Sequence, residues 1–366
     1  MKKTLLDCLV CPICRNDLSI FELETRGSEI GVGILQCKQF KNHIFPIIRG
    51  IPRMLEDSLA YHAKELKNYK EIVGCDFKKA TGPKNLLSKE YKHIQKSFSS
   101  EWSKIKDKDY AWGQDLQCRR DLFFKCIDKE PSAIEGMRVL DAGCGHGEVV
   151  LSLLDFNLEI FAVDISDAVD QLKKRTEGLN NHDREKIHII QGNIFSIPFK
   201  SNLFDIVYCA GVLHHTPNTF ETFKSVSNTL KKSGGIYFVE LYSMEHKNCF
   251  EKFLIPITDL VRKITYRLPH NLLHFLCYIG APFLWLYINI FNNISGSKRY
   301  QARSIKESEL SLFDSLSPRY DWRHYTEEVK NWFRALGYTN IKKTFFNQNV
   351  IGVRGELKSS GYNPKV

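Results

Sequence analysis

The chain of 366 residues lacks the features that mark several special classes of protein. It has no low-complexity segment and no internal repeat. Its 43% hydrophobic and 26% charged residues match an average soluble globular protein, which excludes intrinsic disorder and a collagen-like fibre. No apolar run of signal-peptide length precedes the first charged residue, so we expect a cytoplasmic protein. At about 150 residues per domain, the length predicts two domains, one of them with an insertion.

Acidic residues are in deficit, because 42 Asp and Glu face 52 Lys and Arg, which leaves a net charge of +10. That excess permits an anionic partner such as RNA, a phosphate-bearing substrate or an acidic lipid surface, without selecting one of them. The 11 cysteines are an odd number and are spread from Cys8 to Cys277, too sparsely for a secreted disulfide scaffold. We therefore expect reduced thiols that are available to bind metal.

From Met137 onward, short apolar runs alternate with helical segments. This alternation predicts a parallel sheet that is covered by helices on both faces. A last helix stops at Gly337, and two strand-like runs follow it as an antiparallel hairpin. The predicted strands end at 140 or cover 160–163, 187–190, 204–209, 236–241, 340–346 and 350–357, and the predicted helices cover 148–156, 167–177, 219–230 and 325–336.

The first 55 residues have a different texture, small and β-rich, and they contain four potential metal ligands. A Cys-x-x-Cys knuckle lets two thiolates reach one ion, and tetrahedral zinc takes four such ligands. A segment of this size buries little surface, so a metal would supply much of its folding free energy. The candidate ligands are Cys11, Cys14, Cys37 and His43.

Other interpretations of these four residues stay open. They can be ordinary buried cysteines with His43 on the surface, and Cys8 is a spare thiol that could replace one of the four. A redox role for Cys11 and Cys14 is disfavoured, because no thioredoxin-like βαβ unit surrounds them.

Two stretches of this segment carry a resemblance to a known family. Leu5-Leu-Asp-Cys-Leu-Val-Cys-Pro-Ile-Cys14 and the later run His43-Ile-Phe-Pro-Ile-Ile-Arg-Gly-Ile-Pro52 resemble the small zinc-ribbon family that activates tRNA and protein methyltransferases. Such a ribbon is often fused in front of bacterial methyltransferases. The resemblance implies a structural zinc site in a ribbon domain over 1–55, followed by a helical linker or lid over 56–135.

The loop Asp141-Ala-Gly-Cys-Gly-His-Gly147 follows a predicted strand and opens a predicted helix. Glycines let the backbone turn tightly and approach a ligand closely. A dinucleotide fold would want a third glycine or alanine at position 148, where this chain has Glu. An acid before the first glycine would repel a pyrophosphate but can accept a hydrogen bond from an ammonium group. The spacing therefore favours S-adenosylmethionine over NAD.

Three further motifs follow in register: Asp164 at the end of the next strand, Gln191-Gly-Asn-Ile194, and Asp205 through His215. Together with the glycine loop they resemble the class I S-adenosylmethionine-dependent methyltransferases of the quinone-biosynthesis group. The resemblance implies a Rossmann-like α/β fold over 136–357, with a seven-stranded, mostly parallel sheet and a C-terminal antiparallel hairpin. It also implies a cofactor site formed by Asp141, Ala142, Gly143, Cys144, Gly145, Gly147, Asp164, Ile165, Asn193, Ile194, Ala210 and Gly211.

By that resemblance Asp141, Gly143 and Gly145 cradle the methionyl end of the cofactor, and Asp164 takes the ribose hydroxyls. Asn193 departs from the family, which usually has Asp there. Its amide oxygen can still accept a hydrogen bond from the adenine, so we expect binding to be retained.

His214 and His215 follow the fourth strand of the predicted sheet, at the carboxyl edge where ligands bind in open α/β folds. One of them can act as the base for an acidic acceptor, and we favour His215; the alternative is that both only pack and shape the cavity. Upstream residues can form a helical lid over the cofactor or simply connect the two domains. These are Phe98 to Trp102, Tyr110 to Trp112, Arg119 and Arg120.

An apolar insertion over about 245–320 separates the fifth strand from the last helix. Between Arg267 and Lys298 there is no Asp, Glu, Lys or Arg, which is long enough for a membrane span. A single crossing would leave the last helix and hairpin on the wrong side, and Gly280-Ala-Pro282 interrupts the run. We therefore expect a helical hairpin, 268–279 and 283–293, that lies on an anionic lipid surface or caps the protein or a dimer partner.

These observations predict a methyltransferase acting on a small-molecule, lipid-like, lipid-linked or glycan-type acceptor. Five polar residues after the insertion are candidates for contact with that acceptor or belong to a solvated connection: Arg319, Tyr320, Asp321, Arg323 and His324. An RNA methyltransferase is the second hypothesis. It is disfavoured because an apolar insertion is a poor RNA surface and no Asn-Pro-Pro-Tyr-type motif follows the fourth strand. A non-catalytic cofactor-binding protein is the third.

Overall fold

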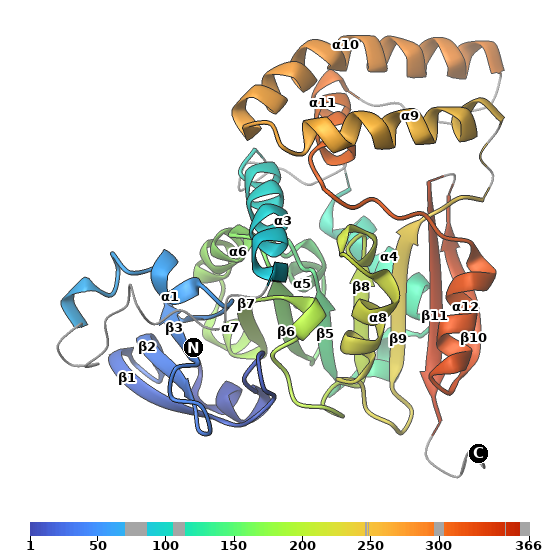
Figure 1. Cartoon of the computed structure of the whole chain (residues 1–366). Coiled ribbons are helices and arrows are strands. Elements are labelled where there is room, and N and C mark those ends of the chain that lie inside the picture. Colours follow the sequence, from blue (N-terminus) through green and yellow to red (C-terminus); the bar gives the residue numbers. More distant parts are fainter. Residues whose placement is uncertain are drawn as a thin grey trace.

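The structure is a computed structural model that describes residues 1–69, 86–104, 114–245, 247, 249–295, 304–347 and 349–358. One eleven-stranded sheet runs through these residues in the order β1-β2-β3-β4-β7-β6-β5-β8-β9-β11-β10 (Figure 1). The strands are β1 (Leu18–Arg26), β2 (Glu29–Cys37), β3 (Ile44–Ile48), β4 (Ile51–Met54), β5 (Arg138–Ala142), β6 (Glu159–Asp164), β7 (Ile187–Gly192), β8 (Ile206–Ala210), β9 (Ile236–Tyr242), β10 (Tyr338–Phe346) and β11 (Val350–Leu357).

The seven strands β5 to β11 form the Rossmann-like sheet that the sequence predicts. Strands β7, β6, β5, β8 and β9 are parallel, and β11 pairs antiparallel with β9 and with β10. The five parallel strands are almost entirely buried, which explains why they read as continuous apolar runs rather than as alternating ones. The α/β fold class is therefore confirmed.

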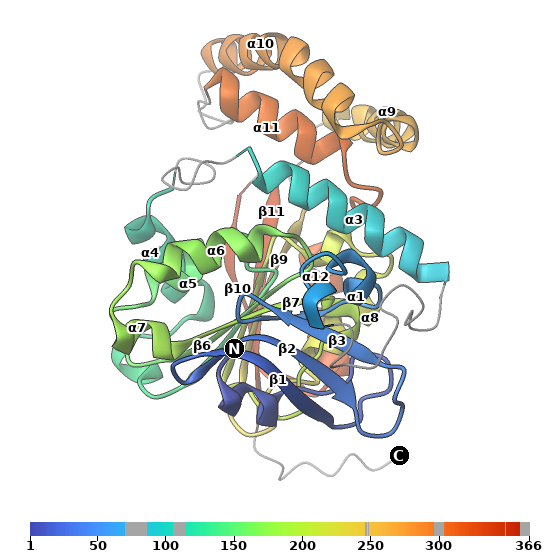
Figure 2. The ribbon, with the colours of Figure 1, turned by 90° about the vertical axis from the view of Figure 1, so that its left-hand side faces the viewer.

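Helices cover both faces of this sheet (Figures 1 and 2). Phe223 of α8 and Phe333 of α12 belong to the core on one face, while Phe123 of α4 and Leu172 of α6 belong to the core on the other. The helices are α1 (Ser58–Tyr61), α3 (Leu86–Trp102), α4 (Leu116–Ile127), α5 (Glu148–Ser152), α6 (Ala168–Glu177), α7 (Asn181–Lys186), α8 (Thr219–Ser227), α9 (Cys249–Thr265), α10 (His270–Ser295), α11 (Ile305–Leu316) and α12 (Thr326–Ala335).

The amino-terminal segment extends the sheet of the larger domain. Strand β4 pairs in parallel with β7, with Arg53 opposite Gln191 and Met54 opposite Gly192. The Arg53 guanidinium is fully buried and donates to both carboxylate oxygens of Asp170 on α6, at 3.1 and 2.7 Å. This continuation was not predicted, because no residue pattern within β4 identifies β7 as its partner.

The insertion consists of α9, α10 and α11, and α10 is the layer farthest from the sheet (Figures 1 and 2). The predicted hairpin, 268–279 and 283–293, is wrong, because α10 continues through Pro282 from His270 to Ser295. A proline removes one main-chain hydrogen bond and crowds the preceding turn, and a helix with much of its circumference uncovered can bend to accommodate it. The lid candidates Tyr110 to Trp112 lie outside the described residues, as do the basic residues that follow the apolar run of the insertion: Lys298, Arg299 and Arg303.

Candidate active site

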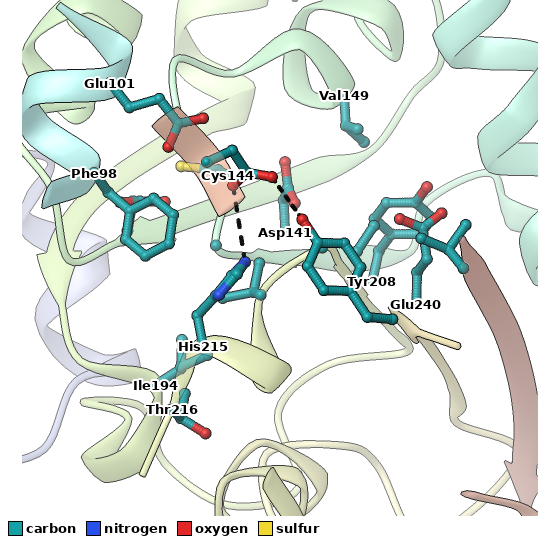
Figure 3. A pocket seen from close by; sticks show the side chains of 18 of the residues that line it. Phe98, Glu101, Asp141, Cys144, Val149, Ile194, Tyr208, His215, Thr216 and Glu240 are labelled. Atoms are coloured by element: carbon teal, nitrogen blue, oxygen red, sulfur yellow. Dashed lines mark hydrogen bonds and ion pairs between the residues drawn. The ribbon is translucent and has the colours of Figure 1, made fainter. Parts of the chain in front are cut away.

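A cavity of about 520 Å³ lies at the carboxyl ends of the parallel strands, between the sheet, α3 and α11 (Figure 3). Seven carboxyl groups line it, against three Lys or Arg side chains. A cavity with this excess of acid suits a ligand that carries positive charge. The acids are Glu101, Asp141, Glu148, Asp164, Glu240, Asp314 and Asp321, and the cations are Arg119, Lys247 and Arg323.

The glycine loop forms the floor of this cavity after β5. Gly143 has a φ of +91°, and a Cβ at this position would lie 2.2 Å from a methyl carbon of Val212. The backbone N–H groups of Gly143 and Cys144 both donate to the Val163 carbonyl, at 2.7 and 3.1 Å, which holds the loop against β6. Only glycine meets both requirements at position 143, so the loop is shaped by its sequence.

The other two glycines of the loop have different surroundings. The Trp102 ring of α3 lies against Gly145, where an added Cβ would be 2.5 Å from it, and Gly145 is not among the residues that line the cavity. Gly147, with a φ of +86°, precedes α5 and packs against Leu172, so its role is in the helix start and the packing. The residues of the loop 142–147 that line the cavity are therefore Gly143, Cys144 and His146.

Asp141 lies at the end of β5 and its side chain faces the cavity (Figure 3). Its Oδ2 atom is buried and has no hydrogen-bond partner among the described residues. Burial, and to a lesser extent the Asp164 carboxylate, raise the pKa of Asp141 to about 7, although Arg119 lowers it. An unpaired buried carboxylate is costly, and the ammonium group of S-adenosylmethionine is a donor that would satisfy it.

Asp164 ends β6 and is already engaged with the loop. Its Oδ2 accepts from the Gly145 N–H at 2.9 Å, and its Oδ1 accepts from the N–H and the hydroxyl of Ser166 at 2.8 and 2.6 Å. A carboxylate offers about four acceptor sites, so these bonds leave about one, on Oδ2. The expected grip on both ribose hydroxyls therefore reduces to one direct acceptor, and the other role of Asp164 is to position the glycine loop.

The remaining cofactor candidates divide into two groups. Ile165, Asn193, Ile194, Ala210 and Gly211 line the cavity, whereas Ala142 is fully buried in β5 and does not. The Asn193 side-chain oxygen accepts from the Phe195 N–H at 3.0 Å, which leaves one lone pair of that oxygen for a ligand. The sheet edge thus brings together residues from four separate strands, as the predicted topology requires.

His215 faces the cavity from the segment after β8 (Figure 3). Its Nδ1 lies 2.9 Å from the Tyr320 carbonyl oxygen, which can only accept, so the neutral ring carries its proton on Nδ1. The Nε2 lone pair is then directed toward the cavity, 4.0 Å from Oδ1 of Asp314. The Tyr242 hydroxyl donates to Oδ2 of the same Asp314 at 2.6 Å, which orients that carboxylate.

His214 has different surroundings. Its ring is fully buried, does not line the cavity and packs 3.9 Å, centroid to centroid, from the Tyr242 ring. Neither ring nitrogen has a hydrogen-bond partner among the described residues, and burial, followed by the nearby His215, lowers the pKa of His214 well below its usual value. His214 is thus a neutral packing residue in this structure.

Several cavity residues were not singled out from the sequence. Glu240 of β9 is the clearest, and burial raises its pKa to about 7. Glu101 belongs to the stretch Phe98 to Trp102 that was a candidate lid, and it lines the cavity from α3 together with Phe98 and Trp102. Burial, together with Asp314 and Asp164, raises the pKa of Glu101 well above its usual value. Asp314 lies in the insertion, far from any recognisable motif. Of the five polar residues proposed as acceptor contacts, Asp321 and Arg323 line the cavity. The sequence offered one signal for Glu240, which is its position two residues before the end of a strand, close to the edge of the sheet where ligands bind.

The four candidate metal ligands come together in the amino-terminal segment that contains β1 to β4. The ligand atoms of Cys11, Cys14, Cys37 and His43 all lie within 4.8 Å of one another. Cys14 and Cys37 sulfurs are 3.5 Å apart, and the Cys11 sulfur is 3.4 Å from Nδ1 of His43. Zn–S bonds of about 2.3 Å in a tetrahedron place two sulfurs about 3.8 Å apart, so the cluster has the size and the donor set of a zinc site. Cys8 is not part of it.

Comparison with known proteins agrees with this geometry. Residues 140–238 match the methyltransferase domain family. The chain is 28% identical over 142 residues to demethylmenaquinone methyltransferase of Staphylococcus saprophyticus, which covers 36% of this chain and 59% of that protein. It is 27% identical over 147 residues to sterol 24-C-methyltransferase erg6 of Aspergillus fumigatus, which covers 35% of this chain and 38% of that protein.

The matched regions thus span about 59% and 38% of the length of these two relatives. Among solved structures, magnesium protoporphyrin IX methyltransferase of Synechocystis PCC 6803 is similar with a TM-score of 0.37 and 12% identity, over 82% of this chain and 96% of that chain. The sheet topology and the family match agree on one assignment: residues 140–238 are an S-adenosylmethionine-dependent methyltransferase domain of class I.

Proposed function

We propose that this protein transfers the methyl group of S-adenosylmethionine to a small, largely apolar acceptor that has an acidic proton. The observation that carries the proposal is the unpartnered Asp141 carboxylate in an acid-rich cavity above the glycine loop. The bound cofactor supplies an activated sulfonium methyl group, and the protein has to position the acceptor and exclude water.

The residues of the chain divide this work between two sides of the cavity. On the cofactor side, Asp141 holds the ammonium group, the Gly143 and Cys144 backbone allows close approach, and Asn193 and Ile194 contact the base. On the acceptor side, Tyr242, Asp314, Asp321 and Arg323 supply polar contacts between β9 and α11. The named acceptors of two relatives, a demethylmenaquinone and a sterol, are apolar molecules with a polar group, which supports the same acceptor class here.

His215 is the proposed base. Its Nε2 accepts the acceptor's proton while Nδ1 stays hydrogen-bonded to the Tyr320 carbonyl, so the ring does not need to turn. The imidazolium that results lies beside Asp314, whose negative charge stabilises it. Such proton transfer typically contributes about 10²–10⁴-fold to a rate.

We also propose that Cys11, Cys14, Cys37 and His43 hold a structural zinc ion. The ribbon of 1–55 resembles a fused methyltransferase activator, and none of the four cluster residues lines the cavity. Its strand β4 pairs with β7, which ends at Gly192 and leads directly into Asn193. A folded ribbon therefore supports the strand that positions Asn193 and Ile194, the proposed contacts of the adenine base.

Tritium from methyl-labelled S-adenosylmethionine tests the proposed function. The purified chain is incubated with separate lipid, glycan, RNA and protein fractions of a cell extract, and an Asp141→Asn variant serves as the control. We expect label in the lipid or small-molecule fraction and none with the variant. Label confined to RNA would contradict the proposed acceptor class, and calorimetry showing no binding of S-adenosylhomocysteine would contradict the cofactor.

A further inference from the structure

Helix α9 turns its apolar side outward. Phe253, Ile257, Leu260 and Ile264 follow a helical spacing, and their exposed fractions are 65%, 44%, 62% and 65%. The buried side of the same helix carries Arg262, which is 4% exposed. A helix on the surface of a soluble protein normally buries its apolar side and exposes its charged side. The reversed arrangement of α9 indicates that its outer side contacts an apolar environment rather than water.

Helix α10 repeats the pattern on a larger scale. Its covered side is a narrow row of Leu273, His274, Cys277, Ala281 and Ile288. The rest of the described helix exposes large apolar side chains, which are Leu272, Phe275, Leu276, Tyr278, Ile279, Phe283, Trp285, Leu286, Tyr287 and Ile290. Over His270–Ile290 the mean hydropathy is 1.5, and this segment is long and apolar enough to span a membrane. We call these residues and the four outward residues of α9 the outer apolar surface.

The charges beside the outer apolar surface are positive. Lys252, Lys263 and Arg267 are exposed on α9 or just after it. Among the described side chains of α9 and α10, the acidic one is Asp259, and it is paired with Arg262 at 2.6 Å. A protein partner would need an apolar patch of complementary shape with acidic residues around it. An anionic bilayer offers an apolar interior and negatively charged headgroups to a surface of any shape.

Hydrogen bonds and an ion pair hold α9 against the end of α11 and the segment that follows it. The Arg262 side chain donates to the Ser315 carbonyl at 2.9 Å and is paired with Asp321, and the Thr265 hydroxyl donates to the Leu316 carbonyl at 2.8 Å. Since α11 then returns toward the sheet, α9 and α10 cannot cross a bilayer without breaking these bonds. The two helices can therefore contact a bilayer only by lying in the plane of its interface with water.

Helix α11 connects this surface to the cavity. Its Phe313 packs under α10, where the ring stacks on His274 with centroids 3.8 Å apart. The neighbouring Ser311, Asp314 and Ser315 line the cavity. One helix therefore separates the outer apolar surface from the acceptor side of the proposed active site.

We propose that the outer apolar surface docks on an anionic phospholipid bilayer and brings the cavity to an acceptor that is dissolved in the lipid. The identity of the acceptor as a lipid-phase molecule rests on the proposed function, whereas the docking itself does not. The occupant is a bilayer interface, into which the apolar side chains insert while Lys252, Lys263 and Arg267 meet lipid phosphates.

Vesicle flotation of the full chain tests this proposal, with vesicles of phosphatidylcholine alone and of phosphatidylcholine with about 30% phosphatidylglycerol, an anionic lipid. We expect flotation with the anionic vesicles. The double variant Phe275→Glu/Phe283→Glu should lower the partition coefficient at least about tenfold, because two apolar side chains no longer insert. The matched control is Phe21→Glu on β1, where Phe21 is 54% exposed, and it should float like the wild type.

Lipid contact and cofactor binding are measured alongside flotation. Brominated lipids should quench the fluorescence of wild-type protein and not that of a Trp285→Phe variant. Calorimetry with S-adenosylhomocysteine should give equal affinity for all variants, which separates failed docking from a failed cofactor site. Absence of flotation by a protein that binds S-adenosylhomocysteine overturns the proposal. So does sedimentation showing a wild-type dimer that Phe275→Glu/Phe283→Glu dissociates, since a second copy would then cover the surface.

Discussion

At the scale of single residues, the cavity shows how burial turns ordinary side chains into reactive ones. Asp141 and Glu240 are common acids whose pKa burial raises to about 7. Asp164 accepts one hydrogen bond from Gly145 of the loop and two from Ser166, and Asp314 accepts one from the Tyr242 hydroxyl. Because the proposed partner of the cofactor ammonium group, Asp141, has such a raised pKa, its part in binding can be tested by titration.

We expect the affinity for S-adenosylhomocysteine to rise with pH up to about 7 and then level off. Below that pH Asp141 is protonated in the free protein, and the ammonium group loses its partner; the loss approaches tenfold per pH unit. Calorimetry from pH 5.5 to 8.5 measures it. Asp141→Asn should lower the affinity at pH 8 and flatten the profile, and the slope that remains reports Glu240. An unchanged profile in the variant would assign the pH dependence elsewhere.

The same raised pKa has a consequence for stability. Between the unfolded pKa of Asp, about 3.9, and the folded value of about 7, the folded chain binds more protons than the unfolded chain. The contribution of Asp141 to the free energy of unfolding therefore falls as pH rises through this window. Without ligand, Asp141→Asn should melt at a higher temperature than the wild type at pH 8 and at nearly the same temperature at pH 4. A lower melting temperature at pH 8 would contradict this.

We expect His215→Gln to lower kcat by about 10²-fold or more while the affinity for S-adenosylhomocysteine stays within about threefold. His214→Phe is the comparison, because its buried ring has no hydrogen bond to lose among the described residues, and kcat should stay within about threefold. Single-turnover rates with the tritium-labelled acceptor fraction measure both. Equal losses in the two variants would mean that His215 shapes the cavity rather than moving a proton.

At the scale of elements, the glycine loop shows a local sequence that is matched to its tertiary surroundings. Gly143 needs a left-handed backbone, and Val212 from the segment after β8 fills the place of its missing side chain. The turn is therefore fixed by two strands at once. The α10 helix shows the reverse case, because the helix continues through Pro282 although proline locally disfavours a helix.

Gly143→Ala should be much more costly than Gly234→Ala. Gly234 has a φ of +74° with nothing within 4 Å of an added Cβ, so alanine there pays the left-handed backbone cost of about 1–2 kcal/mol. Gly143→Ala adds the overlap with Val212, about 1–3 kcal/mol more, and should abolish cofactor binding. Urea unfolding and calorimetry compare the two. Similar unfolding free energies would show that Val212 can move aside freely.

At the scale of the whole molecule, one sheet joins the ribbon, the methyltransferase strands and the hairpin. Besides the β4–β7 pairing, the buried Arg53 joins the ribbon to Asp170, and the Val10 N–H donates to the Pro198 carbonyl at 3.0 Å. Continuous pairing and shared core predict that these parts unfold together rather than as separate domains.

Removing zinc should therefore lower one common thermal transition. We expect about one zinc per chain, lost in Cys37→Ser, with a fall in Tm of at least about 5 °C and a weaker affinity for S-adenosylhomocysteine. Cys118→Ser, at an exposed cysteine outside the cluster, is the matched control and should keep both. Metal analysis and scanning calorimetry check this. Two separate transitions, with cofactor binding intact in Cys37→Ser, would show that the ribbon is an independent module.

Much of the fold and part of the site could be predicted from the sequence, because those features repeat along the chain or are confined to a few neighbouring residues. The apolar strands and the Gly337 helix end are local signals, and outside the insertion the predicted strands and helices lie within a few residues of their observed places. The metal ligands and the glycine loop are likewise short motifs whose residue types dictate their chemistry. The candidates that line the cavity, such as Asp141 and Asn193, were found by such motifs.

Only the tertiary structure decided which distant groups meet. Strand β4 pairs with β7, Asp314 lies beside His215, and Trp102 covers Gly145, although these residues are far apart in the chain. Packing against distant residues also keeps His214 out of the cavity. Burial and charge at such a junction depend on every element packed around it. A sequence pattern records the chemistry of each residue and its neighbours, whereas these contacts are set by how the helices and strands pack in space.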